Sequence, residues 1–310
     1  MSGVITRRRG PFVAGDQVQL TDPKGRRHLI LLQDGRTFHT HRGSLAHDDL
    51  IGSQEGSVVV SSGGTPYVAL RPLLADFTLS MTRGAAVVYP KDAAQIVAMA
   101  DIFPGARVLE AGAGSGALAC WLLRAVGEHG LLVSYERRPD FAEIARQNVE
   151  RFFGGPPPGW QLRPQELPPQ RGGGPPGETG QVEGQPFDRA VLDMLAPWDY
   201  VGTVVGALAL GGVLCCYLAT VTQLSRAVEA IRGHGGFDEP TAWESLNRGW
   251  HAEGLAVRPE HRMVGHTGFL VTSRRLAPGT VAPARRRRPA KGAGPTGGQA
   301  VVEDGSAEKG

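Results

Sequence analysis

The chain has 310 residues, 41% of them hydrophobic, which is enough for one large or two medium domains with a true core. Its three cysteines, Cys120, Cys215 and Cys216, are too few for a disulfide framework and lack the spacing of metal ligands. The sequence shows no signal peptide and no apolar run of roughly 18 residues. We therefore expect a cytoplasmic protein with no membrane partner and no metal.

The formal net charge of +3 is small, but basic residues cluster at 7–9, 24–27 and 285–288. Clusters of this kind bind anionic polymers such as nucleic acids, and they also occur as solvated turns and chain ends. The charge pattern leaves both interpretations open.

Residues 1–75 predict a small β-rich domain. Short runs of strand-forming residues recur along it, with a turn at 22–25 and a hairpin signal at Asp34-Gly35. This spacing is typical of a small barrel or sandwich. The expected strands are residues 18–21, 28–32, 37–41, 57–61 and 67–70.

Residues 76–277 predict a second domain of alternating strands and helices. A connector at 73–80 precedes a helix at 93–101, for which Asp92 is the expected cap. The alternation implies a parallel sheet, and two final strands without a helix between them imply an antiparallel edge hairpin. The expected strands are 108–111, 131–135, 160–163, 187–193, 213–218, 255–258 and 269–275. The expected helices after the first are 118–126, 139–153, 200–210 and 222–233.

Two further segments are unlike the rest of the chain in composition. Residues 168–186 contain six Gly and five Pro among 19 residues, which predicts a surface insertion without a packed element. Residues 278–310 are rich in Pro, Gly, Ala, Arg and Glu, which predicts a disordered tail.

A glycine-rich turn follows the strand at 108–111 and leads into a helix. Its pattern is E-x-G-x-G-x-G, from Glu110 to Gly116, and differs from the G-x-G-x-x-G of dinucleotide folds. Such a turn lets a ligand approach bare backbone beneath a helix N-terminus, although it can also serve packing alone. An acid before the glycines would repel a pyrophosphate but suits a ligand with an ammonium group. S-adenosylmethionine (SAM) is such a ligand.

Acidic residues also end other predicted strands at the same edge of the sheet, where ligands bind in such folds. Glu136 can accept hydrogen bonds from both ribose hydroxyls of SAM, and Glu166 can face its adenine amine. Asp193 begins the stretch Asp193-Met194-Leu195-Ala196-Pro197-Trp198, in which Trp198 can stack on a planar substrate. These residues predict a SAM site beside an aromatic, nitrogen-containing substrate.

From about residue 83 to residue 276 the sequence resembles the bacterial and archaeal tRNA (adenine-58-N1)-methyltransferases, particularly their actinobacterial branch. Six stretches carry the resemblance, in order, over roughly 190 residues, and together they are specific. They are residues 89–92, 108–116, 134–136, 190–198, 219–223 and 265–271. The resemblance implies a SAM-dependent methyltransferase (Rossmann-like) parallel sheet with an antiparallel edge hairpin, a small N-terminal β domain, tRNA as partner and a homotetramer.

The resemblance also implies roles for individual residues. Asp193 would be the catalytic carboxylate, also placed against the cofactor, and Tyr89 would line the pocket for the target base. The residues implied to hold SAM are Glu110, Gly112, Gly114, Ser115, Gly116, Ala117, Leu118 and Glu136, with Glu166 near the adenine. Four residues near the predicted rim, Arg83, Trp198, Arg262 and His266, are expected to contact the substrate.

The sequence departs from the family pattern at three points. Ala86 stands where relatives often have Gln, and Glu166 stands where they often have Asp. The Gly/Pro-rich segment replaces the family's residues after that acidic position. These departures affect contacts with substrate and adenine more than the reaction. Two alternatives stay open: a non-catalytic tRNA-binding subunit of the same fold, and a methyltransferase acting on protein or a small molecule.

Overall fold

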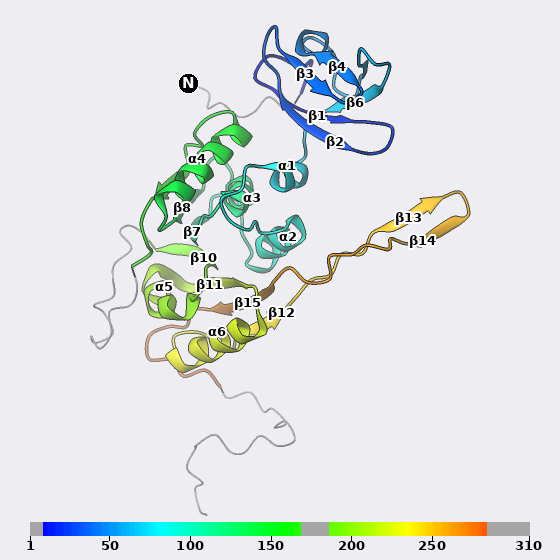
Figure 1. Ribbon diagram of the computed structural model, residues 1–310. Coiled ribbons are helices and arrows are strands. Elements are labelled where there is room, and N and C mark those ends of the chain that lie inside the picture. Colours follow the sequence, from blue (N-terminus) through cyan, green and yellow to red (C-terminus); the bar gives the residue numbers. More distant parts are fainter. Residues whose placement is uncertain (1–8, 169–185, 284–310) are drawn as a thin grey trace, which may run out of the picture.

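The computed structural model describes residues 9–168 and 186–283 (Figure 1). Most of the predicted insertion at 168–186 and of the predicted tail at 278–310 therefore lies outside the described residues. A small β unit is followed by a larger α/β unit, and one long hairpin projects from the latter (Figure 1). No helix in the described ranges is long and apolar enough to cross a membrane.

The N-terminal unit contains a four-stranded antiparallel sheet in the order β2-β1-β6-β5 and a separate hairpin, β3-β4. Its strands are β1 (Gln17–Thr21), β2 (Arg27–Leu31), β3 (Thr37–Thr40), β4 (Gly43–Ala46), β5 (Val58–Val60) and β6 (Pro66–Leu70), with the short helix η1 (His47–Asp49). Alternate residues of β1 and β6 point inward, so that Val18, Leu20 and Tyr67 are buried in one apolar cluster. The predicted β-rich character of the N-terminal part is thus confirmed.

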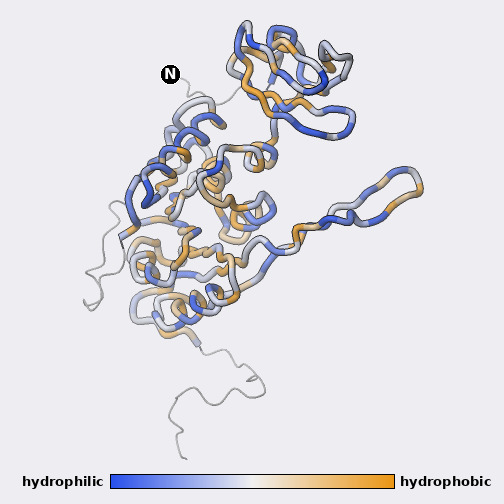
Figure 2. Tube along the Cα trace, viewed as in Figure 1, coloured by the Kyte–Doolittle hydropathy of each residue, from blue (hydrophilic) through white to orange (hydrophobic). Residues whose placement is uncertain are grey.

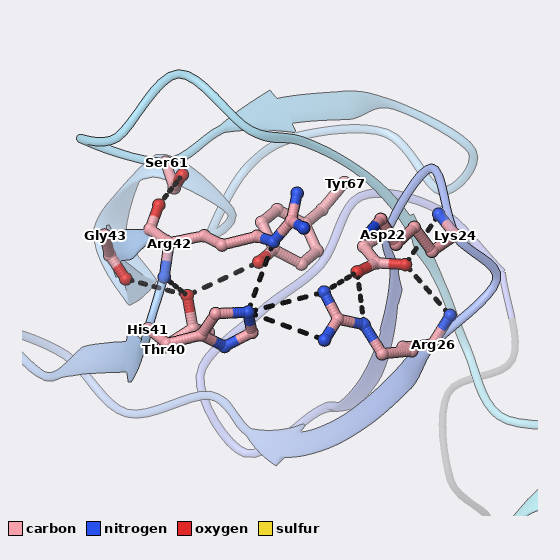
Figure 3. Close-up of polar contacts among 9 residues, drawn as sticks. All are labelled: Asp22, Lys24, Arg26, Thr40, His41, Arg42, Gly43, Ser61 and Tyr67. Carbon is pink, nitrogen blue, oxygen red and sulfur yellow. Dashed lines mark hydrogen bonds and ion pairs between the residues drawn. The ribbon is translucent and has the colours of Figure 1, made fainter.

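Two details of that prediction are wrong. Asp34-Gly35 does not close a hairpin, because β2 pairs with β1 and β3 pairs with β4. The hairpin turn lies at 22–25, where the buried Asp22 carboxylate accepts hydrogen bonds from the backbone N–H groups of Lys24 and Arg26 (Figure 3). Strand β4 was not predicted, since Gly-Ser-Leu-Ala carries no β-branched or aromatic residue.

The second unit is built on a seven-stranded sheet in the order β12-β15-β11-β10-β7-β8-β9. Its strands are β7 (Arg107–Ala111), β8 (Leu131–Tyr135), β9 (Trp160–Arg163), β10 (Phe187–Asp193), β11 (Leu208–Leu218), β12 (Thr241–Trp243) and β15 (Phe269–Arg274). Strands β9, β8, β7, β10 and β11 pair in parallel, and β15 runs antiparallel to β11 and β12. This is the predicted methyltransferase-type sheet with an antiparallel edge.

Helices cover both faces of this sheet. Side chains from α1 (Leu74–Ser80), α2 (Pro90–Met99), α3 (Ala117–Val126) and α4 (Pro139–Phe153) form one apolar cluster with the sheet. Those from η2 (Pro197–Tyr200), α5 (Val201–Ala207) and α6 (Val221–His234) belong to another. Along β7, Val108 enters the first cluster and Leu109 the second, as expected for a strand that is buried on both sides.

The structure corrects several predicted elements. The strand predicted at 255–258 does not join the sheet: β13 (Trp250–Glu253) and β14 (Ala256–Pro259) form a hairpin of their own, and β12 takes the edge. The helix predicted at 200–210 ends at Ala207, because residues from Leu208 onward pair with β10. Asp92 lies within the first turn of α2, whose cap is Tyr89, and the predicted connector contains α1.

Two separate sets of buried residues support the predicted domain division at residue 75. The apolar cluster of the first unit runs from Phe12 to Ala69, and those of the second unit begin at Leu74. A hydrogen bond from Gln17 Nε2 to the carbonyl oxygen of Arg151, at 2.8 Å, joins the two units. The division itself stays a prediction.

Gly116 offers a test of how tightly α3 packs on α4. Its φ is +78°, and a Cβ there would lie 2.9 Å from the carbonyl oxygen of Ala145. Gly235 has the same left-handed conformation, with φ +72° and ψ −3°, but open space around it. We expect Gly235→Ala to cost about 1–2 kcal/mol of unfolding free energy through backbone strain alone. Gly116→Ala should cost about 1–3 kcal/mol more because it also overpacks the contact. Urea denaturation measures both, and equal losses would contradict the packing argument.

Candidate active site

A cavity of about 600 Å³ opens at the carboxyl ends of the parallel strands. Its walls come from the glycine-rich turn, the residues after β8, β9 and β10, the segment before α2, and the ends of β11 and β15. Loops after parallel strands converge at this edge because all these strands point the same way. The cavity is therefore where the sequence predicts the SAM site.

The glycine-rich turn supplies two residues of the cavity wall, Gly112 and Gly114. Gly114 has a φ of +55°, and its N–H donates to Glu136 Oε2 at 2.9 Å. A Cβ at Gly112 would lie only 3.2 Å from the same carboxylate oxygen. Glycine at 112 therefore leaves room for Glu136 to approach the turn, and the acid and the turn form one unit.

The other residues predicted for the turn support it from behind. Ser115 Oγ accepts hydrogen bonds from the backbone N–H groups of Gly84 and Ala85, at 3.1 Å each, and Ala85 lines the cavity. Gly116 is the cap of α3, while Ala117 and Leu118 are buried in the core beneath it. Ser115, Gly116, Ala117 and Leu118 do not line the cavity, so any contact they make with a cofactor stays a prediction.

Glu110 lies beneath the cavity and is wholly buried. Ser134 donates to its Oε2 and in turn accepts from Trp160 Nε1 at 2.9 Å, whereas its Oε1 has no hydrogen-bond partner among the described residues. Burial raises the pKa of the Glu110 carboxyl to about 8. Glu110 is thus largely protonated at neutral pH. It does not line the cavity, so its contact with SAM stays a prediction.

Asp193 ends β10 and faces the cavity. Its backbone is fixed on both sides: its carbonyl oxygen accepts from Gly112 N–H at 3.1 Å, and it pairs in register with Tyr217 of β11. No described residue donates a hydrogen bond to its side chain, which leaves the carboxylate available to a ligand. Burial, together with the nearby charge of Glu136, raises the pKa of Asp193 to about 7.

Glu136 and Glu166 both line the cavity, as predicted from the strand ends. Glu136 is 4% exposed, and its Oε1 accepts from the backbone N–H of Arg138 at 3.1 Å. Glu166 is more open to solvent and accepts from the hydroxyl of Tyr200 at 2.5 Å. The two carboxylates are held in place by the protein in different ways, Glu136 by backbone groups and Glu166 by one side chain.

Two tyrosines and a threonine form another part of the wall: Tyr89, Tyr217 and Thr267. Tyr89 was predicted from the sequence, while Tyr217 and Thr267 were not singled out. Thr267 lies within one of the stretches that carried the family resemblance, which was the available signal. Tyr217 lies in an apolar strand, where an aromatic residue reads as core.

The four residues predicted to contact substrate lie outside the cavity wall. The guanidinium of Arg226 lies over one face of the Trp198 ring, 4.0 Å from the ring centre. Arg83 donates to the carbonyl oxygen of Leu79, and Arg262 is exposed. His266 is hydrogen bonded to Glu244 and to the carbonyl oxygen of Ala219, each at 3.0 Å. Substrate contacts of all four stay predictions.

The sheet, the glycine-rich turn and the acids at the strand ends define a SAM-dependent methyltransferase. A SAM-dependent O-methyltransferase from Thermotoga maritima has the same fold, with a TM-score of 0.78, 27% identity and coverage of 89% of this chain and 96% of that one. The tRNA (m1A58) methyltransferase TrmI of Aquifex aeolicus gives a TM-score of 0.72 at 25% identity, covering 86% and 100%.

Sequence comparison is more specific than the fold. The protein-family model described as TrmI-like N-terminal matches residues 10–59. The family model described as tRNA methyltransferase complex GCD14 subunit matches residues 67–153. The tRNA (adenine(58)-N(1))-methyltransferase TrmI of Thermus thermophilus is 37% identical over 256 residues, 83% of this chain and 95% of that protein. TrmI of Methanocaldococcus jannaschii, named as acting on adenines 57 and 58, is 31% identical and covers 82% and 93%. The chain belongs to the TrmI family of tRNA (adenine-58-N1)-methyltransferases, and its cofactor is SAM.

The described residues fit this cofactor. Gly112 and Gly114 expose backbone to the cavity, and Glu136 offers carboxylate oxygens beside them. Four acids, Glu136, Glu166, Asp193 and Asp199, line the cavity against two arginines, and burial beside Glu136 raises the pKa of Asp193, so a cationic ligand is favoured there. When bound, SAM supplies an activated methyl group on a sulfonium.

Glu136→Ala tests the cofactor site. We expect SAM affinity to fall roughly 10- to 100-fold, since a charge-assisted hydrogen bond contributes about 1.5–3 kcal/mol. The fold should persist, because the side chain is at a strand end. Glu143→Ala is the matched control: that acid is on the exposed side of α4 and pairs with Arg146. Titration calorimetry with SAM measures both, and equal affinities would remove Glu136 from the site.

Proposed function

We propose that this protein transfers a methyl group from SAM to N1 of adenine 58 in the T-loop of tRNA. The observation that carries the proposal is Asp193, a carboxylate without a protein partner in the described residues, which shares one cavity with the glycine-rich turn and Glu136. The names of the relatives that span most of the chain support the same substrate.

Asp193 has a direct role in this mechanism. Adenine N1 carries an in-plane lone pair, and its attack on a methyl group spreads positive charge over the ring and the exocyclic amine. A carboxylate that accepts from this amine stabilises the developing cation more than the neutral base, and so lowers the barrier. The strands on either side fix Asp193, so the electrostatic stabilisation is present before the reaction begins.

The remaining residues bind and orient. Tyr89 and Tyr217 offer ring faces in the cavity wall, where a planar base can pack. N1 lies on the base-pairing edge, so the adenine must turn out of the tRNA to reach Asp193. The reaction then needs alignment of base and cofactor, with no acid or base beyond Asp193.

The proposed partner is tRNA, and the N-terminal unit offers a basic surface that supports it. The guanidinium groups of Arg26 and Arg42 converge on Nε2 of His41, at 3.5 and 3.2 Å (Figure 3). Asp22 holds Arg26 in place through a 2.8 Å ion pair. Arg26, from the 24–27 cluster that the sequence left open, thereby lies beside Arg42, whereas Arg27 pairs with Asp76. The two guanidinium groups at His41 are suited to a phosphate.

We also propose a homotetramer in the cytoplasm, as the family resemblance implies. The projecting hairpin supports self-association, because hydrophobic residues occur along it away from the body of the α/β unit (Figure 2), and their side chains are exposed. Along it, the exposed fractions are 60% for Trp250, 103% for Leu255 and 59% for Val257. A second copy of the chain would shield these groups from water.

Replacing Leu255 and Val257 with Ser tests the assembly. We expect the mass in solution, measured by light scattering, to fall below that of the wild type, because the apolar contact is lost. The paired substitution of Val58 and Val60 on β5, which are similarly exposed, is the control and should leave the mass unchanged. An unchanged mass in the hairpin variant would reject the hairpin as an interface.

Asp193→Ala tests the mechanism. We expect tRNA to bind nearly as before, while the single-turnover rate at saturating SAM falls by about 10²–10³, the typical cost of one preorganised charge-stabilising contact. Asp193→Asn nearly preserves size and can still accept from the amine, so an intermediate rate is expected. Methyl-adenine is mapped in tRNA after incubation with SAM. Wild-type rates in both variants would make Asp193 a structural strand end only.

The same variants give a pH test. Because the pKa of Asp193 is raised to about 7, a growing fraction of the free enzyme carries the charge as pH increases through 7. We expect kcat/KM of the wild type to rise over pH 6–8 and that of Asp193→Asn to stay flat there. The two alternatives that the sequence left open predict other outcomes: a non-catalytic subunit gives no methyl transfer, and a protein or small-molecule enzyme leaves tRNA unmodified.

A further inference from the structure

Lys91, Asp92 and Thr267 form a buried polar network beside the cavity, and the mechanism above does not use it. Lys91 Nζ lies 2.6 Å from Asp92 Oδ1 and 2.6 Å from Thr267 Oγ1. Thr267 Oγ1 also donates to Asp92 Oδ2 at 2.5 Å. The Asp92 side chain is 1% exposed and that of Lys91 is 13% exposed. We call these three residues the clamp.

The clamp connects segments that are far apart in the sequence. Lys91 Nζ donates to the carbonyl oxygen of Ser245 at 2.8 Å, and Ser245 Oγ donates to Asp92 Oδ1 at 3.2 Å. Ser245 lies where the chain enters the projecting hairpin, and Thr267 lies where it returns to the sheet. Both strands at the base of the hairpin are therefore tied to the first turn of α2.

The same network reaches the cavity wall. The hydroxyl of Tyr217 donates to the carbonyl oxygen of Thr267 at 2.9 Å. A Cβ on Gly268 would lie 2.5 Å from the Tyr217 ring, so this ring lies directly on the backbone that follows Thr267. Tyr217 is the register partner of Asp193 on the neighbouring strand. Tyr89 caps the helix that carries Lys91 and Asp92.

The burial of the Asp92 carboxylate has a free-energy cost that its contacts must offset. Removing a charge from water costs several kcal/mol, and an ion pair recovers this only with additional hydrogen bonds. Asp92 has Lys91, Thr267 and Ser245 as partners, so both of its oxygens are satisfied. A buried ion pair contributes little net stability to the fold. A buried network in which every polar group is hydrogen bonded does, however, fix the relative positions of its members. Here the arrangement fixed is that of the wall formed by Tyr89, Tyr217 and Thr267.

We propose that Asp92 and Thr267 are positioning residues for methyl transfer: the clamp holds Tyr217 and Thr267 against α2, so that the target base is aligned with Asp193. This proposal rests on the proposed function. Thr267 lines the same cavity as Gly112, Gly114 and Glu136, but among the described residues the clamp makes no hydrogen bond to them. We therefore expect the clamp to act on base alignment and not on SAM binding.

The sharpest test compares Thr267→Val with Thr267→Ser. Valine keeps the shape but removes the hydroxyl that bridges Lys91 and Asp92, whereas serine keeps the hydroxyl. We expect Thr267→Val to lower the single-turnover rate at saturating SAM and tRNA by about 10- to 100-fold, since small misplacements in an active site have effects of this size. Thr267→Ser should retain most of the rate, and SAM affinity should stay within twofold in both.

Thr203→Val is the matched control. Thr203 is 1% exposed, and its hydroxyl donates to the carbonyl oxygen of Pro168 at 2.7 Å, away from the clamp. Its substitution should lower stability without changing the rate. Tyr217→Phe, which removes only the contact with Thr267, provides a second variant if Thr267→Val does not fold. Equal rates for Val and Ser at 267, or a loss of SAM affinity that matches the loss of rate, would overturn the proposal.

Hydrogen exchange gives a readout that does not depend on activity. In Thr267→Val, amides of the adjoining β12–β15 ladder, in residues 241–243 and 269–272, should exchange faster, while those of residues 112–116 should be unchanged. If the wild type leaves tRNA unmethylated, the proposed function fails, and the exchange data still decide whether the clamp holds these segments. If the wild type methylates tRNA but exchange and rate are unaltered in the variant, only the clamp proposal fails.

Discussion

The parallel pairing of β10 with β7 and β11 is the constraint on which the site depends. It places Asp193 beside the glycine-rich turn on one side and beside Tyr217 on the other. The hydrogen bond from Gly112 N–H to the carbonyl oxygen of Asp193 joins the glycine-rich turn to the end of β10. Because this link is made by backbone, it does not depend on the Asp193 side chain, to which we assign the chemistry.

Charge is the second organising feature of the site. Three acids, Glu110, Glu136 and Asp193, lie close together, and the pKa values of Glu110 and Asp193 are raised by burial and by the neighbouring charges. The protein keeps Glu110 largely protonated and gives Glu136 backbone donors, while it leaves Asp193 without a partner among the described residues. A cationic ligand reduces the repulsion among these acids. Positive charge that develops on the substrate during the reaction has the same effect.

The two walls of the cavity are stabilised in different ways. The cofactor side is held by local contacts, in which a glycine-rich turn meets a carboxylate from the next strand. The other side is held by the clamp, whose residues are separated by up to 176 positions in the chain. The hairpin whose base the clamp secures also exposes large apolar side chains. Under the proposed role of the clamp, substrate alignment and the environment of the hairpin are linked through Thr267.

The sequence by itself determined the order of the strands and helices from β7 to α6, the glycine-rich turn and the acids Glu136 and Asp193 at the strand ends. These depend on local periodicity and on the rule that parallel strands end at one edge. It could not show that Glu110 is fully buried beneath the cavity. The sequence pattern around position 110 is the same whether the acid faces the cavity or the interior. It placed residues 255–258 in the sheet, whereas their exposed side chains belong to a separate hairpin. Only the tertiary structure decided that Tyr217, Thr267 and Asp92 meet, because long-range contacts between polar side chains leave no periodic signal in the chain.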